Sequence, residues 1–162
     1  MRKLLFLCCL MLLSASMAAA QGKITTKWSC GKPTPVHALE PGDQPDHAYS
    51  ISQVKCTATA GEIAGVKQKE GVGTEFHEIT AGTSRFRGTF VETLANGDKI
   101  TYSYEGTAKV KPGVLESADN KFSASSGTGT FKGIKANGTC KGTGNPDGTA
   151  SFACAGDYST SK

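Results

Sequence analysis

Residues 136–158 read Ala-Asn-Gly-Thr-Cys-Lys-Gly-Thr-Gly-Asn-Pro-Asp-Gly-Thr-Ala-Ser-Phe-Ala-Cys-Ala-Gly-Asp-Tyr, and this stretch decides the fold class. Its centre, 145–149, has the composition of a tight turn. Proline presets φ, aspartate suits the next position, and glycine tolerates the left-handed conformation that closes a three-residue loop. We therefore predict a β-hairpin in which Asn145 lies opposite Thr149 and paired residue numbers sum to 294.

This register places Cys140 directly opposite Cys154, at a non-hydrogen-bonded pair where the Cα atoms lie close enough for a disulfide. Closing a loop of about 15 residues contributes roughly 3 kcal/mol in the chain-entropy model. By exclusion, the two remaining cysteines outside the N-terminal segment, Cys30 and Cys56, form a second disulfide. No close cysteine pair with zinc-ligand spacing occurs, so we predict no metal site.

The same register sorts the hairpin residues onto two faces. The first face carries the small and apolar residues: Ala136, Gly138, Cys140, Gly142, Ala150, Phe152, Cys154, Gly156 and Tyr158. The second face carries mainly lysine, threonine, asparagine and aspartate. Alternation with a period of two indicates an antiparallel hairpin with one buried face. Phe152 falls opposite Gly142, where its ring can cover the bare backbone.

A second hairpin is predicted from residues 85–94 and 98–110, whose apolar residues also alternate. Asn96-Gly97 suggests a two-residue type I′ turn, which would set the apolar face of one strand beside the polar face of the other. A three-residue loop, Ala95-Asn96-Gly97, matches the faces instead, with paired numbers that sum to 192. We favour this register because mismatched faces are costly where one face is buried.

Further strands are predicted, and no segment has a helical apolar stripe. The strands are expected at 23–30, 48–58, 63–70, 72–80 and 125–134. Long connections are expected at 31–46, which is rich in proline, and at 111–120. Eight or nine short antiparallel strands in about 140 residues are typical of a small closed barrel or a sandwich.

The N-terminus has the pattern of a secretory signal peptide, residues 1–20. Arg2 and Lys3 precede an apolar run over 4–13, and Ala18-Ala19-Ala20 supplies small residues for cleavage. An uncleaved anchor is the alternative, but ten residues are too few to span a bilayer as a helix. We therefore predict an exported protein, periplasmic or extracellular, without stable membrane insertion.

Composition narrows the class further. Without Arg2 and Lys3 the chain has 16 basic and 14 acidic residues, a net charge of about +2, which argues against a nucleic-acid binder. Ile, Leu, Val and Phe number only 22 beyond residue 20, whereas all 20 glycines lie there. So few large apolar residues indicate disorder only together with a high net charge, which is absent here. The chain is too short for a large multidomain enzyme.

Glu92 is the most informative single residue. By parity it shares a face with Phe86, Phe90 and Leu94, so it points into the interior. A buried carboxyl group needs a partner or has a raised pKa. The same face carries two tyrosines, and a carboxyl group beside tyrosines can transfer protons or orient a small ligand.

We therefore name two sets of candidates. The catalytic candidates are Glu92, Tyr102 and Tyr104, and the ligand-binding candidates are Phe86, Phe90, Glu92 and Tyr104. The alternative for Glu92 is a purely structural hydrogen bond near the barrel mouth. No cofactor is implied by any motif.

Three other groups of polar residues are interpreted as solvated. Glu75 and His77 share a face with one apolar neighbour, Ile79, which favours a strand surface over a proton-transfer or metal site. His37 and His47 stand among acidic residues in the proline-rich arm at no metal-ligand spacing. Two arginines, Arg85 and Arg87, share an outer face with Lys99, Lys109 and Glu105.

Residues 126–144 contain Gly-x-Gly-x-Phe-x-Gly followed by a second glycine-rich segment, with matching positions Gly127, Gly129, Phe131, Gly133 and Gly138. This pattern resembles the allene oxide cyclase and dirigent barrel superfamily. The segment from Phe90 to Lys99 adds to the resemblance. The chain is also similar to small exported bacterial proteins of unknown function assigned to that barrel.

The resemblance implies an allene oxide cyclase-like, calycin-like barrel of about eight strands over 48–162, preceded by an N-terminal strand and arm over 21–47. Active superfamily members cyclise fatty-acid epoxides or steer phenoxy-radical coupling, and they often form trimers, which implies a homo-oligomer. Fold alone does not establish function. We expect non-catalytic binding of a small apolar ligand, or of an envelope partner. The alternative is an isomerase or cyclase that uses an interior carboxyl group and a tyrosine.

Overall fold

The computed structural model describes residues 20–111 and 114–160, which form ten strands and one 3₁₀ turn. In chain order they are β1 (Ala20–Cys30), β2 (Val36–Leu39), β3 (His47–Ala60), β4 (Glu62–Ile63), β5 (Val66–Thr80), β6 (Thr83–Leu94), β7 (Lys99–Lys111), β8 (Val114–Gly127), η1 (Gly129–Phe131), β9 (Lys135–Gly144) and β10 (Ala150–Thr160). The predicted signal peptide lies outside the described residues, apart from Ala20.

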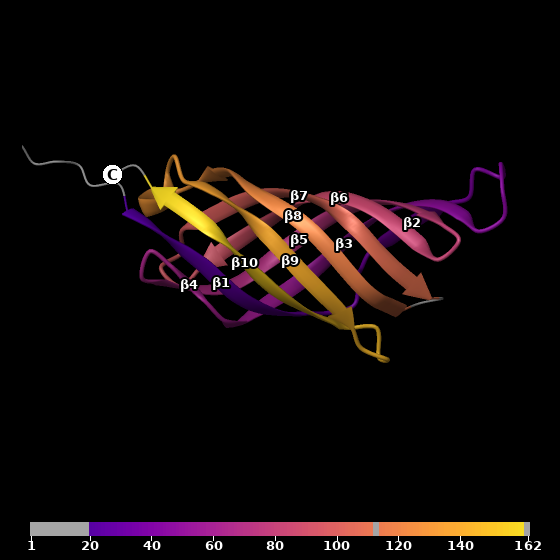
Figure 1. Ribbon diagram of the computed structural model, residues 1–162, viewed down its shortest axis with the longest axis horizontal. Coiled ribbons are helices and arrows are strands. Elements are labelled where there is room, and N and C mark those ends of the chain that lie inside the picture. The colour runs from indigo at the N-terminus through magenta and orange to yellow at the C-terminus, as the bar shows by residue number, and fades with distance from the viewer. Residues whose placement is uncertain (1–19, 112–113, 161–162) are drawn as a thin grey trace, which may run out of the picture.

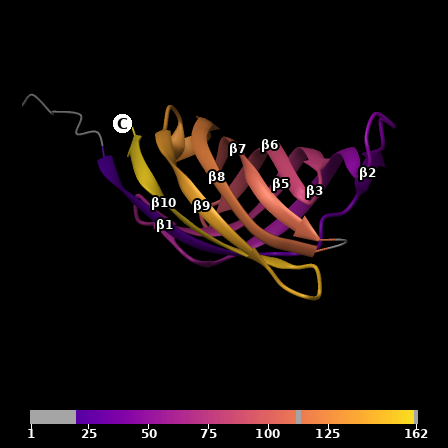
Figure 2. The ribbon, with the colours of Figure 1, turned by 45° about the vertical axis from the view of Figure 1, so that its right-hand side comes forward.

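Eight of these strands form a closed antiparallel barrel (Figure 1). They run in the order β3-β1-β10-β9-β8-β7-β6-β5, and pairing of β3 with β5 closes the circle. The two remaining strands are short additions: β2 pairs with β3 beyond the end of β1, and β4 pairs with β5. The turned view shows the strands wrapping around one long axis (Figure 2). The predicted all-β barrel is confirmed.

The hairpin 136–158 has the predicted register. Ala150 pairs with Gly144 and Cys154 with Cys140. In the turn, the Asn145 N–H donates to the Thr149 carbonyl oxygen at 2.8 Å, and Gly148 takes the expected left-handed conformation with φ 84°. The Asp147 carboxylate accepts hydrogen bonds from the backbone and the hydroxyl of Thr149, at 2.9 and 2.7 Å. The turn sequence therefore sets the pairing of both strands.

The second hairpin, β6–β7, has the three-residue loop that strand parity predicts. Glu92 pairs with Ile100, and the Leu94 N–H donates to the Asp98 carbonyl oxygen at 2.9 Å. Gly97 is left-handed, with φ 87°. Matching of the buried faces has therefore determined this register, although Asn96-Gly97 favours a two-residue turn.

Both predicted disulfides are present. Cys140–Cys154 joins β9 to β10, and Cys30–Cys56 joins β1 to β3. In each case the two cysteines lie directly opposite one another on neighbouring strands. Because β1 and β10 are also neighbours, the two bridges lie on four adjacent strands of the wall.

The predictions between residues 111 and 134 are wrong. The supposed connection 111–120 is mostly the first half of β8, which pairs with β7 along its whole length. The supposed strand 125–134 ends at Gly127 and continues as η1. Gly129 has φ 50°, and the Asp98 carboxylate accepts hydrogen bonds from the backbone and hydroxyl of Thr130, at 3.1 and 2.9 Å. The glycine-rich motif thus forms a turn anchored to the β6–β7 loop.

Two further details differ from the sequence interpretation. The strands predicted at 63–70 and 72–80 are largely one strand, β5, with an irregularity between Gln68 and Glu70 that shifts its register against β6. The proline-rich arm 31–46 is mostly loop but contains β2, which pairs with β3. The N-terminal strand β1 lies between β3 and β10 in the barrel wall.

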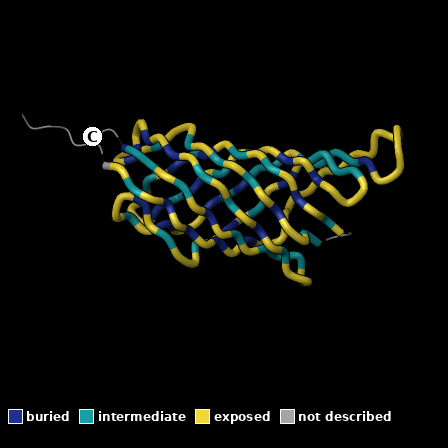
Figure 3. The backbone as a smooth tube through the Cα atoms, viewed as in Figure 1, coloured by how far each residue is buried: buried dark blue, intermediate teal, exposed yellow. Residues whose placement is uncertain are grey.

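Apolar side chains close one end of the barrel, where β4, η1 and the end of β10 lie (left in Figure 1). This end plug consists of Ile24, Ile63, Leu94, Ile100, Tyr102, Phe131, Ile134 and Ala136. Along the strands, buried and exposed residues alternate (Figure 3). Near the opposite end the buried cluster is smaller, with Phe86, Ala108 and Ala118.

Candidate functional site

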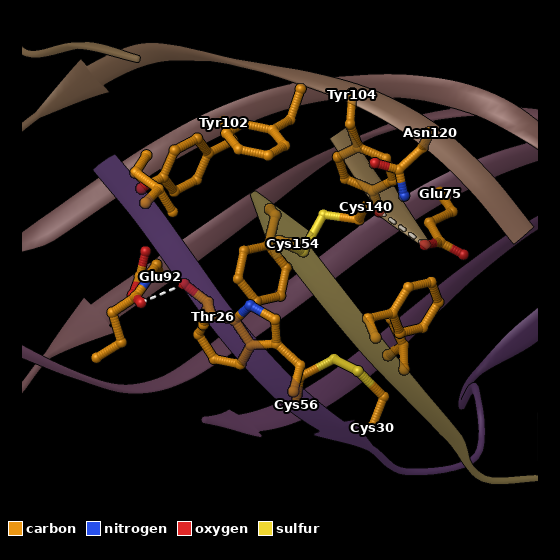
Figure 4. Close-up of a pocket in the computed structure, with 17 residues that line it drawn as sticks. Thr26, Cys30, Cys56, Glu75, Glu92, Tyr102, Tyr104, Asn120, Cys140 and Cys154 are labelled. Atoms are coloured by element: carbon orange, nitrogen blue, oxygen red, sulfur yellow. Dashed lines mark hydrogen bonds between the residues drawn. A yellow bond between two sulfur atoms is a disulfide. The ribbon is translucent and has the colours of Figure 1, made fainter. Parts of the chain in front are cut away.

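The barrel interior contains a cavity of about 100 Å³. Its wall is drawn in Figure 4 and comprises Ile24, Thr26, Trp28, Cys30, Val54, Cys56, Gln68, Glu75, Phe90, Glu92, Tyr102, Tyr104, Asn120, Phe122, Cys140, Phe152 and Cys154. Both disulfides therefore belong to the wall. The wall holds two carboxyl groups and neither lysine nor arginine.

Glu92 reaches the cavity because β6 alternates its side chains between the interior and the outer surface. Its cross-strand neighbours are Ile100 on β7 and Gly71 on β5. Gly71 leaves room for the ring of Phe90: a Cβ at Gly71 would lie 2.2 Å from that ring. The interior near Glu92 is thus filled by rings over bare backbone, with the carboxyl group among them.

The carboxyl group of Glu92 is fully buried and has an unusual protonation equilibrium. Its exposed fraction is 0%, and neither oxygen makes a hydrogen bond of standard geometry. Burial raises the pKa of Glu92 to about 7, while the Gln68 amide and the Tyr102 hydroxyl, which face it, partly oppose this rise. Near neutral pH the group can therefore give up or accept a proton.

The groups around Glu92 are only partly satisfied. The Thr26 hydroxyl donates to Oε1 of Gln68, which fixes the amide beside the carboxyl group. The buried Tyr102 hydroxyl faces Glu92 but makes no hydrogen bond of standard geometry. Burial, followed by the charge of Glu92, raises the pKa of Tyr102 far above its ordinary value. The tyrosine is therefore a neutral hydroxyl, free to bond to a ligand.

A second polar group lies in the same interior. The Tyr104 hydroxyl donates to Glu75 at 2.8 Å, and the other oxygen of Glu75 lies 3.0 Å from Nε2 of His77. On the other side of the His77 ring, Nδ1 lies 3.0 Å from the Ser84 hydroxyl, so these four side chains form one hydrogen-bonded series. The interpretation of Glu75 and His77 as a solvated strand surface is therefore wrong, because their face of β5 points inward.

Gly88 makes the Tyr104–Glu75 bond possible. It lies between the two residues in one cross-strand row, opposite Glu75 on β5 and Tyr104 on β7. A Cβ there would lie 2.8 Å from the Tyr104 hydroxyl oxygen and 2.4 Å from the Thr74 carbonyl oxygen. The tyrosine can therefore lie across β6 and reach the carboxylate two strands away.

Aromatic rings line the middle of the cavity, between the two polar groups (Figure 4). Trp28 meets Phe90 edge to face with ring centroids 5.1 Å apart, and Tyr102 meets Phe122 in the same way at 5.6 Å. The ring of Phe152 covers Gly142, as the hairpin register predicts. The site thus has an apolar centre with a carboxyl group on either side.

The structure brings most of the predicted site residues together. Phe90, Glu92, Tyr102 and Tyr104 all line the cavity. Phe86 lies outside its wall and packs instead against the rings of His77 and Tyr104, with centroids 5.7 and 6.2 Å away. Binding and catalysis by these residues stay predictions.

Sequence reasoning missed several wall residues: Thr26, Trp28, Gln68, Glu75 and Asn120. Alternation along 23–30 could have placed Thr26 and Trp28 on one face with Ile24. Gln68 lies next to the irregularity in β5, which breaks that alternation.

The remaining polar residues lie outside the cavity. His47 is buried, with Nδ1 2.7 Å from Asp43 and Nε2 3.6 Å from Glu78. Arg87 lies over the outward-facing ring of Phe76, 5.4 Å from its centroid. Within 20–111 and 114–160, no group of three or more His, Cys, Asp or Glu side chains could hold a metal ion. The same residues include no helix of the length and apolarity that crossing a membrane requires.

Two solved structures share this architecture. The pterocarpan synthase dirigent protein PsPTS1 matches with a TM-score of 0.53 and 12% identity, over 88% of this chain and 97% of that one. The pterocarpan synthase dirigent protein GePTS1 matches with a TM-score of 0.52 and 13% identity, over 89% and 90% of the two chains. No protein-family model matches the sequence, and the comparison with curated proteins gives no significant match. The chain therefore has the fold of a dirigent-like barrel.

Proposed function

We propose that this protein binds a small, mainly apolar ligand inside the barrel, through a hydrogen-bond acceptor such as a carbonyl group that meets Glu92. One observation carries the proposal. A fully buried carboxyl group and a buried tyrosine hydroxyl, neither of which makes a hydrogen bond of standard geometry, line one apolar cavity. Leaving such groups unpaired costs about 1–3 kcal/mol each, so a ligand that pairs with them gains binding energy.

The cavity volume limits the ligand to about one ring. Engineered apolar cavities of about 150 Å³ take up benzene, and pockets for drug-sized ligands have about 300–1,000 Å³. At about 100 Å³, the cavity is smaller than those benzene-binding cavities, so it suits one small ring at most, with any substituent outside the enclosed volume. The fold likeness to dirigent proteins supports a role in binding or guiding a small molecule. Two disulfides and the predicted signal peptide support action outside the reducing cytosol.

Trp28 provides a direct assay, because it is the only tryptophan of the chain and lies in the cavity wall. Cyclohexanone and methylenecyclohexane have nearly the same shape, but only the ketone has a hydrogen-bond acceptor. We expect both to change Trp28 fluorescence. The ketone should bind more tightly at pH 6 than at pH 8, because protonated Glu92 donates to its oxygen, and the hydrocarbon should show no pH dependence.

Two substitutions of Glu92 separate the effect of its protonation from the effect of its hydrogen bond on ketone binding. Glu92→Gln keeps a neutral donor, so it should bind the ketone without pH dependence. Glu92→Leu should bind the ketone no better than the hydrocarbon. Glu105→Gln is the matched control, because Glu105 is exposed on the outer face of β7. Absence of binding of either probe, by fluorescence and by calorimetry, would show that the proposal is wrong.

The pKa of Glu92 favours a second candidate, an isomerase or cyclase-type enzyme. The ionised carboxyl group would remove a proton from carbon beside a carbonyl group, while the Tyr102 hydroxyl donates a hydrogen bond to the oxygen. In D₂O, this chemistry exchanges the α-hydrogens of cyclohexanone for deuterium. Exchange by the wild type that Glu92→Gln abolishes would favour the enzyme. If cyclohexanone binds but its deuterium exchange is no faster than in buffer alone, the protein is a binding protein and not an enzyme of this type.

A further inference from the structure

The side chains of the cavity wall that can carry a charge near neutral pH are acidic, and none is basic. Glu75 and Glu92 are its only ionisable groups apart from two tyrosines, and no lysine, arginine or histidine lines it. The aromatic rings between the carboxyl groups present negative π-faces to the interior. An anionic ligand would lose its hydration here without gaining a cationic partner, which is strongly unfavourable. The wall therefore excludes anions and favours neutral or positively charged molecules.

The side of the cavity at Glu75 is more exposed than the side at Glu92. The side chains of Glu75 and His77 are 18% and 20% exposed, whereas Glu92 is 0% exposed. Beyond Glu92 the end plug closes the barrel with Ile63 and Phe131, both 0% exposed. Glu75 is thus at the more exposed end of the cavity, next to the small buried cluster of Phe86, Ala108 and Ala118, and Glu92 is at its enclosed end.

The two carboxyl groups are well separated. Glu75 pairs with Gly88 on β6, and Glu92 follows four residues later on that strand. At about 3.3 Å per residue, this places their backbone positions about 13 Å apart. Figure 4 shows Glu75 with Tyr104 and Asn120 on one side of the aromatic rings and Glu92 with Thr26 on the other. A ligand that spans the centre can therefore present one group to each.

Glu75 is held by two neighbouring side chains. It accepts the Tyr104 hydrogen bond on one oxygen and contacts His77 through the other. Burial, followed by the negative charge of Glu75, raises the pKa of Tyr104 far above its ordinary value. The tyrosine stays a donor and holds the carboxylate in place. Since each carboxylate oxygen can accept more than one hydrogen bond, capacity remains for a ligand.

We infer that the cavity selects ligands with a protonated amine, whose ammonium group pairs with the Glu75 carboxylate at the more exposed end while its ring lies among Trp28, Phe90 and Phe122. This inference rests on the proposed binding function, and it specifies the chemical class of the ligand. The aromatic wall adds to it, because ring faces attract ammonium groups. Glu75 is the specificity-determining residue, and Glu92 meets the opposite end of the ligand.

Three probes of nearly equal shape test the inference: benzylamine, benzyl alcohol and benzoate. At pH 7.5 they are cationic, neutral and anionic, and each carries one aromatic ring. Dissociation constants are measured by calorimetry and Trp28 fluorescence. We expect benzylamine to bind at least about fivefold more tightly than benzyl alcohol, and benzoate to bind most weakly. Raising the salt concentration should reduce the preference for the amine.

Two matched variants assign the effect to charge. Glu75→Gln removes the charge and can still accept the Tyr104 hydrogen bond, so benzylamine and benzyl alcohol should bind within about twofold of each other. Tyr104→Phe removes the hydroxyl and leaves the charge, so the preference for the amine should persist. Thermal unfolding and the masses of the disulfide-linked peptides confirm that each variant is folded. If Glu75→Gln does not fold, Asn120→Lys replaces it, and benzoate should then bind more tightly than benzylamine.

The outcomes separate this inference from the proposed function. Equal binding of the amine and the alcohol by the wild type, or an unchanged preference in Glu75→Gln, would overturn the inference and leave the binding function intact. Tightest binding of benzoate would do the same. Failure of all three probes to bind would overturn both.

Discussion

At the scale of single residues, Glu92 links folding to pH. Its pKa is about 7 in the folded protein against an ordinary value of 4.5, so the folded state holds this proton more tightly than the unfolded state. The stabilisation is complete below about pH 4.5 and is lost as the pH rises through 7. We predict that the unfolding free energy of the wild type, relative to Glu92→Gln, falls by roughly 3 kcal/mol between pH 4.5 and pH 8.

Urea denaturation at a series of pH values measures this difference. Because both proteins share every other titrating group, the difference isolates Glu92. Glu105→Gln, on the exposed outer face, should follow the wild type at every pH. A constant difference between wild type and Glu92→Gln across this range would contradict the prediction.

Gly88 offers a second test at this scale. Alanine there would bring its Cβ within 2.4 Å of the Thr74 carbonyl oxygen and into the Tyr104 hydroxyl group. We predict that Gly88→Ala lowers the unfolding free energy by about 3 kcal/mol, near the upper end for overpacking, because backbone must move. Gly31→Ala is the control, since its Cβ would lie 3.7 Å from the nearest atom. Equal stability of the two variants in urea would contradict this.

At the scale of elements, the two disulfides stabilise neighbouring strand pairs. Cys140 and Cys154 are 14 residues apart in sequence, and Cys30 and Cys56 are 26 apart. Loop entropy predicts that replacing either pair by alanine costs about 3 kcal/mol. Denaturant titration of the double variants C140A/C154A and C30A/C56A measures each cost. A loss below about 1 kcal/mol for both would show that the unfolded state is not restrained by these loops.

The elements also show what the sequence predicts well. Both hairpins with identifiable turns have the predicted register. The turn residues and the alternation of buried and exposed side chains that set this register are local properties of the chain. Cys140–Cys154 follows directly from that register. Glu92 was placed in the interior for the same reason, since its strand carries Phe86, Phe90 and Leu94 on one face.

The errors have a physical cause in long-range pairing. The first half of β8 is rich in Ser, Ala, Asp and Asn, which rarely favour strands, and it is extended because β7 and β9 lie on either side of it. On β5, Phe76 faces outward while Gly71, Gly73, Glu75 and His77 face inward. Apolar periodicity therefore indicated the wrong face, and the second carboxyl group of the cavity was overlooked.

At the scale of the whole molecule, glycine compensates for the lack of large aliphatic residues. Interior glycines lie under aromatic rings, as Gly71 does under Phe90, Gly138 under Phe122 and Gly142 under Phe152. Few apolar side chains are then enough to fill a narrow barrel, apart from the cavity. The low apolar content of the sequence is thus a property of this architecture and does not indicate disorder.

The first and last strands of the barrel are partners, which gives a prediction about chain connectivity. Ala20 pairs with Thr160, and the loop 95–97 is exposed. We predict that a circular permutant, with Thr160 joined to Ala20 by a short glycine linker and new termini in that loop, folds with both disulfides. Circular dichroism and peptide mass mapping test this. Loss of the native disulfide pairs in the permutant would contradict it.

The pairing of β1 with β10 also sets the order of events during synthesis. β1 is the first barrel strand to be made, yet all eleven of its residues pair with β10, the last strand, and only four of them also pair with β3. Until β10 is complete, the growing sheet has two open edges and no closed interior. Cys30 can meet Cys56 early, but Cys140 must wait for Cys154. The Cys140–Cys154 disulfide therefore forms only when the last barrel strand has been made. A ribosome that stops before residue 150 therefore releases an open sheet that exposes unpaired backbone, which neighbouring chains can join.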